Sequence, residues 1–203
     1  MSAAPTVRLA TRDELPAVGR VLARAFADDP VYTWLAPPSP ERDDRAADWF
    51  EREARVQFDH HGEVWVDDEL RGAAVWTAPG HWRGGVREAL PMLLPSLRYY
   101  RRRVVRGLRT VGAMQRAHPA RPEHWYLALL GTDPDHGGHG IGSALVRAVT
   151  GRCDRYGLGA YLESSKEQNV PFYGRLGFVA SAPIGVSGGP GLIPMWRDPE
   201  PPA

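Results

Sequence analysis

One glycine-rich stretch limits what this 203-residue chain can fold into more than any other feature. The sequence DPDHGGHGIGSAL, residues 133–145, places glycines at 137, 138, 140 and 142, directly before apolar residues at helical spacing. The start of a helix leaves its first amides unpaired and carries a partial positive charge, so it can bind phosphate through main chain alone. Glycines allow that close approach because they lack a Cβ atom. We therefore expect a phosphate-binding turn ahead of a helix that starts near Ile141.

Two common nucleotide-binding motifs do not describe this turn. A Walker loop ends in lysine followed by serine or threonine, and no lysine stands here. The dinucleotide fingerprint has the order G-x-G-x-x-G, whereas residues 137–142, GGHGIG, have the order G-x-x-G-x-G. Taken alone, the stretch is equally compatible with a structural turn before a helix.

Composition favours one globular domain over residues 1–203. Hydrophobic residues make up 43% and charged residues 24%, close to the averages of globular proteins. The net charge of +1 predicts neither a nucleic-acid nor a strongly acidic partner. A single cysteine, Cys153, cannot form an internal disulfide, and no apolar run reaches the roughly 18 residues of a membrane span. We expect a cytoplasmic protein without a membrane partner, present as a monomer or homodimer.

Periodicity and turn residues predict an α/β (α+β) fold in which helices flank one sheet. Thr11 and Glu14 have the spacing of a capping box, and Leu15, Val18 and Leu22 recur at helical spacing after them. The other predicted elements are a strand at 7–10, a loop carrying Tyr32 and Trp34, a helix at 41–60, a hairpin of 64–66 with 73–77, one long or two shorter helices within 83–116, strands at 124–132 and 160–165, a helix from 141, a short helix at 170–176, and a last pair formed by 178–182 and 192–197.

Residues 99–109, YYRRRVVRGLR, form the most basic run of the chain. Such a run can bind nucleic acid, or it can be the solvated face of an amphipathic helix. The near-neutral total charge favours the solvated face.

Two ordered motifs resemble the GNAT superfamily of acyl-CoA N-acyltransferases. The first is DPDHGGHGIGSALV, in which Gly140 and Gly142 match the glycines of the family's acetyl-CoA loop. The second is YLESSKEQNVPFYGRLGF, residues 161–178, which is similar to the family's element of Asn, aromatic-Tyr and Leu-Gly-Phe. The resemblance implies a mixed, mostly antiparallel twisted sheet that is splayed at the acetyl-CoA site, with a helical insertion at about 81–120.

The resemblance also implies the cofactor and its contacts. Acetyl-CoA would lie between two splayed strands as a pseudo-strand, which is a form of β-augmentation. One departure is Gly137, which stands where the family usually has Arg or Gln, so weaker cofactor binding is expected unless His136 or His139 compensates. The implied cofactor contacts are Leu130, Gly131, Thr132, Gly137, Gly138, His139, Gly140, Ile141, Gly142, Ser143 and Asn169.

The same resemblance assigns two catalytic candidates. Tyr173 matches the family's tyrosine that protonates the departing thiolate, a role suited to a phenol with an ordinary pKa of about 10. Glu163 is the candidate base for the acceptor amine, with a structural role as the equal alternative. Asp29, Tyr32 and Trp34 would form the acceptor wall, since aromatics beside acids suit a cationic amine. No metal site is expected.

The acceptor class rests on a narrower likeness. Stretches at 6–30, 64–79 and 161–178 are most similar to the puromycin N-acetyltransferase group, which implies a small antibiotic-like amine such as an aminonucleoside, and a role in resistance or detoxification. Two alternatives stay open at this point: acetylation of a protein lysine or N-terminus, and acyl-CoA binding without catalysis.

Overall fold

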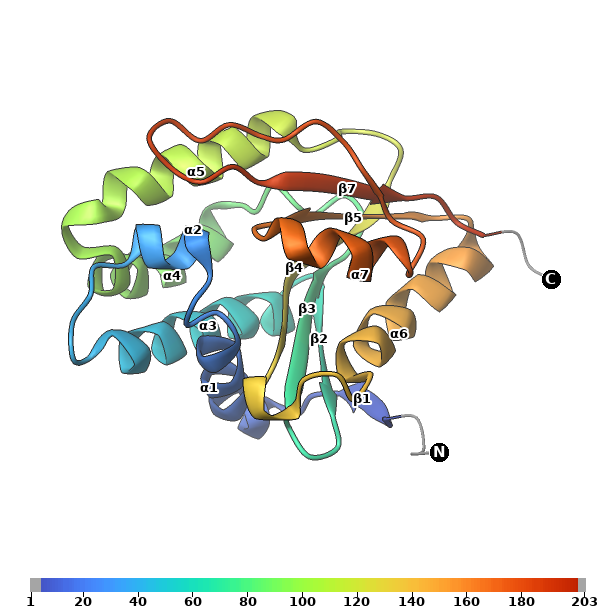
Figure 1. Cartoon of the computed structure of the whole chain (residues 1–203), viewed down its shortest axis with the longest axis horizontal. Coiled ribbons are helices and arrows are strands. Elements are labelled where there is room, and N and C mark those ends of the chain that lie inside the picture. Colours follow the sequence, from blue (N-terminus) through green and yellow to red (C-terminus); the bar gives the residue numbers. More distant parts are fainter. Residues whose placement is uncertain (1–4, 201–203) are drawn as a thin grey trace.

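A seven-stranded sheet organises the protein, seen in a computed structural model that describes residues 5–200 (Figure 1). The spatial order is β1-β2-β3-β4-β5-β7-β6, and every neighbouring pair is antiparallel except β4 with β5. This confirms the predicted fold class. The strands are β1 (Val7–Leu9), β2 (Gly62–Asp67), β3 (Gly72–Thr77), β4 (His124–Thr132), β5 (Gly159–Ser164), β6 (Val179–Ala180) and β7 (Ile193–Arg197).

Seven α-helices surround this sheet within the described residues, and none of them is long and apolar enough to cross a bilayer. They are α1 (Leu15–Ala25), α2 (Pro30–Leu35), α3 (Arg42–Asp59), α4 (Val86–Tyr100), α5 (Val104–Ala117), α6 (Ile141–Tyr156) and α7 (Val170–Gly174).

The central strands carry apolar side chains on both faces, so two separate cores form. Val75 on β3 packs into the core beneath α1 and α3, whereas its neighbours Ala74 and Trp76 pack into the core beneath α6. Successive side chains of a strand point to opposite faces, so a strand covered on both sides reads as a continuous apolar run. Figure 1 shows α1 and α3 on one side of the sheet and α6 on the other.

Tyr32 and Trp34 lie on the short helix α2, so their predicted placement on a loop is wrong. Pro30 occupies the first turn, where its missing amide costs no hydrogen bond. The Asp29 carboxylate caps the helix, accepting hydrogen bonds from the amides of Val31 at 2.9 Å and Tyr32 at 3.2 Å. Asp29 and Pro30 therefore start a new helix where a loop was expected from the sequence.

The arginine-rich segment between β3 and β4 forms two helices. Arg101, at a φ of 50°, ends α4, and a short 3₁₀ turn leads into α5. Two of its arginines are not solvated as predicted: Arg103 donates to the carbonyls of Thr33, Trp34 and Ala36, and Arg106 donates to Trp34 at 2.9 Å. These hydrogen bonds satisfy carbonyls at the end of α2, so this part of the basic run has a structural role.

Candidate active site

Strands β4 and β5 pair over only part of their length. Their parallel register runs from His124 opposite Gly159 to Leu127 opposite Leu162. At that point β4 also carries a β-bulge: consecutive residues Val75 and Trp76 of β3 face Leu129 and Leu127, which leaves Ala128 as the extra residue. A bulge bends its strand and re-aims the chain. Beyond it β4 and β5 diverge, as the resemblance implies.

A cavity of about 450 Å³ occupies this gap and extends toward α2, α3 and α5. That volume lies in the range of small-molecule sites. Among the residues predicted to form the site, the cavity wall contains Leu130, Gly131, Thr132, Asn169, Glu163, Tyr173, Asp29 and Tyr32. Trp34 is absent from the wall; it packs against Gly189, with the guanidinium of Arg106 5.0 Å above its ring.

Tyr173 lies on α7 and is 8% exposed. Its ring packs edge-on against Phe172 at 5.0 Å and Phe178 at 6.0 Å, which holds the side chain in one place on the cavity wall. Burial, together with the charge of Asp29, raises the pKa of Tyr173 well above its ordinary value. The phenol therefore stays protonated at every physiological pH, and the raised pKa makes it a weaker acid than a free phenol.

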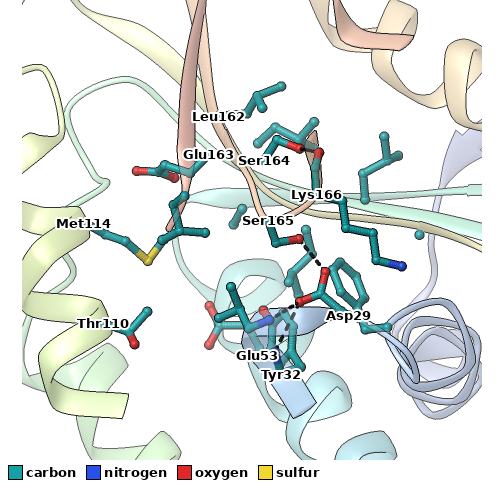
Figure 2. Close-up of a pocket in the computed structure, with 18 of the residues that line it drawn as sticks. Asp29, Tyr32, Glu53, Thr110, Met114, Leu162, Glu163, Ser164, Ser165 and Lys166 are labelled. Carbon is teal, nitrogen blue, oxygen red and sulfur yellow. Dashed lines mark hydrogen bonds between the residues drawn. The ribbon is translucent and has the colours of Figure 1, made fainter. Parts of the chain in front are cut away.

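Glu163 reaches the cavity from β5, where β5 leaves β4 (Figure 2). Its side chain is 1% exposed, and neither carboxylate oxygen has a hydrogen-bond partner among residues 5–200. Burial and the nearby Glu163 charge raise the pKa of the Tyr126 and Tyr161 phenols. A buried carboxylate without a partner costs free energy, so this one is available to a cationic ligand.

Asp29 faces the same cavity, but its oxygens are already used. Besides capping α2, its carboxylate accepts a short hydrogen bond from the Ser165 hydroxyl, shown in Figure 2. Lys166 donates a hydrogen bond to Asp28 at 2.6 Å. Ser165 and Lys166, which follow β5, therefore bind Asp29 and Asp28, which follow α1. Both carboxylate oxygens of Asp29 therefore accept hydrogen bonds from the protein itself, so Asp29 has a structural role whether or not it also contacts an acceptor.

Asp29→Ala should lower the free energy of unfolding by about 1–2 kcal/mol, the usual cost of losing a helix cap. Asp29→Asn should change it by less than about 0.5 kcal/mol, because asparagine also caps helices well. Chemical denaturation of both variants measures this difference. If Asp29→Asn is stable yet raises the KM of the acceptor more than tenfold, Asp29 binds the acceptor after all.

The backbone geometry of the glycine-rich turn agrees only in part with what the sequence suggested. Gly138 and Gly140 have φ values of 79° and 80°, which side-chain-bearing residues rarely adopt, and Gly140 immediately precedes α6. Gly137 has a φ of −62°, which suits any residue, so its lack of a side chain is not required by the turn. At Gly142 an added Cβ would lie 3.4 Å from the Phe172 ring.

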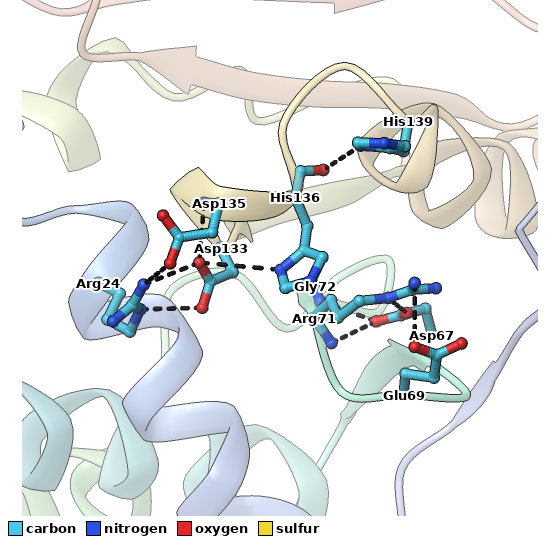
Figure 3. Close-up of polar contacts among 9 residues, drawn as sticks. All are labelled: Arg24, Asp67, Glu69, Arg71, Gly72, Asp133, Asp135, His136 and His139. Atoms are coloured by element: carbon cyan, nitrogen blue, oxygen red, sulfur yellow. Dashed lines mark hydrogen bonds and ion pairs between the residues drawn. The ribbon is translucent and has the colours of Figure 1, made fainter.

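Contacts with two other elements hold this turn in place (Figure 3). Arg24 of α1 binds Asp133 at 2.8 Å and Asp135 at 2.6 Å, and the Asp133 amide donates to the Arg71 carbonyl at 2.7 Å. His139 is exposed, and its Nδ1 lies 3.2 Å from the His136 carbonyl. Arg24 thus offsets part of the negative charge beside the turn, and no other residue within 5–200 accepts a loop hydrogen bond from the amides of Ile141, Gly142 or Ser143.

Sequence reasoning missed the part of the cavity wall supplied by α3 and α5. Glu53 and Gln57 come from α3, and Thr110 and Met114 from α5. A signal existed for Glu53: it follows Trp49 by four residues, so it lies in an apolar row of the helix. Burial raises the pKa of Glu53. Nothing in the sequence brings α5 to this site, because only tertiary packing sets that distance.

The cavity wall contains three carboxylates, Asp29, Glu53 and Glu163, against one basic residue, Lys166, which is bound to Asp28. Within residues 5–200, no group of His, Cys, Asp and Glu is arranged to hold a metal ion. The site is therefore rich in acidic side chains and lies next to a phenol.

Comparisons with known proteins agree with this geometry. The model of the acetyltransferase (GNAT) family matches residues 27–178. An uncharacterized N-acetyltransferase of Schizosaccharomyces pombe is 29% identical over 194 residues, covering 88% of this chain and 77% of the relative. A structure described as histone acetyltransferase HPA2 and related acetyltransferase, from Corynebacterium glutamicum, is 26% identical with a TM-score of 0.71, over 99% of both chains. An acetyltransferase from Thermus thermophilus shares the fold at 14% identity, with a TM-score of 0.55 over 97% of both chains. The chain thus belongs to the GNAT family and is an acetyltransferase whose acetyl donor is acetyl-CoA.

Proposed function

We propose that this enzyme transfers the acetyl group to the primary amine of a small cationic molecule. The observation that carries the proposal is the anionic cavity in the β4–β5 gap, where Glu163 has no partner within residues 5–200 and Tyr173 lines the same wall. A cation is the ligand that best offsets the desolvation of such carboxylates.

Acetyl-CoA fits the described residues in two places. The unpaired edge of β4 beyond the bulge offers main-chain groups of Leu130 and Thr132 to an extended amide-bearing arm. The turn before α6 offers amides to a diphosphate, with Gly138 and Gly140 keeping side chains away. Asn169, on the cavity wall beside Tyr173, is the proposed third contact.

The proposed chemistry needs two groups of the protein. When bound, acetyl-CoA supplies a thioester that is activated toward attack by an amine. Glu163 accepts a proton from the acceptor ammonium, which frees the nitrogen lone pair. Tyr173 donates its phenolic proton to the departing thiolate and recovers one from the acylated nitrogen.

An aminonucleoside of the puromycin type is the first acceptor to test, because aromatic residues such as Tyr32, Trp49 and Tyr126 line the wall beside the acids. Thiol release from acetyl-CoA should be measured across a panel of amine antibiotics, aliphatic di- and polyamines and lysine-bearing peptides. Turnover of one or more small amines with no turnover of peptides is the expected result. Exclusive turnover of peptides would overturn the proposal.

Acetylation of a protein lysine remains the second candidate, favoured by the description of the Corynebacterium glutamicum structure as a histone acetyltransferase. The acidic and aromatic side chains on the cavity wall, among them Glu53, Tyr32 and Trp49, favour the small acceptor. Acyl-CoA binding without catalysis is no longer retained, because the chain belongs to a family of acetyltransferases.

Glu53 should contribute to acceptor binding rather than to the chemical step. Glu53→Gln should raise the KM of a cationic acceptor about 10-fold or more, the usual effect of removing one charged partner, and leave kcat within about threefold. Since burial raises the pKa of Glu53, its charge and hence acceptor affinity should increase as the pH rises through that raised value. Steady-state kinetics from about pH 5 to 8 measures both effects. An unchanged KM at every pH would contradict this role.

A further inference from the structure

A second group of titratable side chains, His118 and His124, lies next to Glu163 and is not among the residues that line the acceptor cavity. His118, at the C-terminal end of α5, places Nδ1 3.8 Å from Oε1 of Glu163 and Nε2 3.0 Å from Nε2 of His124. The His118 side chain is 3% exposed. Its ring stacks on Trp82 at 3.9 Å, which fixes the plane of the imidazole.

The hydrogen-bond donors and acceptors of His118 and His124 can be assigned by starting from His124. Nδ1 of His124 lies 2.8 Å from the Pro122 carbonyl, and a carbonyl only accepts, so this nitrogen carries a proton. Burial lowers the pKa of His124, which favours the neutral ring. Nε2 of neutral His124 is then an acceptor, so Nε2 of His118 donates to it.

In its neutral form, a His118 ring that donates from Nε2 has its lone pair on Nδ1, and Nδ1 is the nitrogen that lies 3.8 Å from Oε1 of Glu163. At 3.8 Å the two atoms are too far apart for a hydrogen bond, and neither carboxylate oxygen has a partner within residues 5–200. A proton added to Nδ1 makes this nitrogen a cationic donor beside the carboxylate, and a charge-assisted hydrogen bond forms once the two atoms approach by about 1 Å. The other titratable groups facing His118 are the phenols of Tyr126 and Tyr161, edge-on at 4.8 and 4.6 Å, and burial keeps both protonated by raising their pKa.

We infer that His118 is a positioning residue that receives, through Glu163, the proton leaving the acceptor amine. This rests on the proposed role of Glu163. The acceptor ammonium loses one proton to Glu163, which passes it to Nδ1 of His118 and regains its negative charge. The nitrogen loses a second proton as the amide bond forms, and that proton restores Tyr173 after its donation to the thiolate. One proton per turnover therefore remains on His118, and it returns to solvent after the product leaves.

The test compares His118→Gln, whose amide can still donate to His124 but cannot hold the proton, with Glu163→Gln. At about pH 6.5, where aliphatic amines are protonated, each variant should lose about 100-fold in kcat with the KM of acetyl-CoA unchanged. At about pH 10, where much of the amine is already neutral, both defects should shrink to less than about threefold. The double variant should be no slower than the slower single variant.

The outcomes separate the inference from the proposed function. A His118→Gln defect equal at both pH values, beside a Glu163→Gln defect that disappears at high pH, would overturn the role of His118 and leave the base in place. A Glu163→Gln enzyme with normal kinetics throughout would remove the base itself. Nitrogen-15 NMR of the wild-type histidines gives a readout independent of activity and of variant folding: His118 should be protonated at Nε2 and bare at Nδ1, and a protonated Nδ1 in the resting enzyme would refute the inference.

Discussion

Tyr173→Phe is expected to lower kcat by about 100- to 10,000-fold, the range for loss of a general acid, while the affinity for acetyl-CoA stays within about twofold. The ring contacts with Phe172 and Phe178 survive the substitution, so the hydroxyl is the only part removed. Steady-state kinetics and calorimetric titration of coenzyme A measure the two quantities. Because the pKa of Tyr173 is raised, the wild-type rate should show no alkaline decline from this group near its ordinary value of about 10.

Tyr156→Phe is the matched control, since Tyr156 is 73% exposed at the end of α6 and is not among the residues that line the cavity. It should retain wild-type kinetics. Full turnover by Tyr173→Phe with unchanged cofactor binding would show that the thiolate leaves without help from this phenol, or that water protonates it.

Ser143→Asp should abolish tight cofactor binding without harming the fold. Ser143 is the third residue of α6, where a carboxylate complements the helix dipole and typically adds about 0.3–1 kcal/mol of stability. The same carboxylate would oppose a diphosphate bound at these amides, and like charges about 4 Å apart near a protein surface repel by up to about 4 kcal/mol. We expect coenzyme A to bind at least about 100-fold more weakly, with a melting temperature that is equal or higher.

Ser143→Asn has nearly the same shape as the aspartate and no charge, so it isolates the electrostatic effect. Calorimetry should show binding within about threefold of wild type for this control, and a small improvement with added salt for the aspartate variant. Equal affinity of the Asp and Asn variants would place the diphosphate elsewhere.

Local patterns were sufficient for most elements of the fold. The apolar runs at 124–132 and 160–165 became β4 and β5, and the turn ahead of Ile141 became the start of α6, because these signals depend on residues close in sequence. The pattern failed at Asp29-Pro30, where the same residue pair can end one helix or cap the next. Which of the two occurs depends on what the following turn packs against: Tyr32 lies among Phe26, Trp49 and Phe50.

The residues of the candidate site also divide into those that a sequence motif predicts and those that only the folded structure brings together. Tyr173, Glu163 and Asn169 were found from one continuous motif, and the structure places them on one cavity wall. The contact between His118 and Glu163 could not be predicted from the sequence, since the two residues lie 45 positions apart and meet only because α5 returns to the sheet. Trp34 was assigned to the cavity by its neighbours in sequence, whereas Arg106 and Gly189 hold it elsewhere.

The sequence by itself determined the elements, the open amides before α6 and the phenol that follows β5, because backbone preference and side-chain type are local properties. Only the tertiary structure decided that β4 and β5 separate after Leu127, and that Asp29 is already occupied by α2 and Ser165. It also decided that Glu53 and Glu163 line one cavity and that His118 lies 3.8 Å from Glu163. Charges and hydrogen bonds act over a few ångströms in space, and the distance between residues far apart in the chain exists only once the chain has folded.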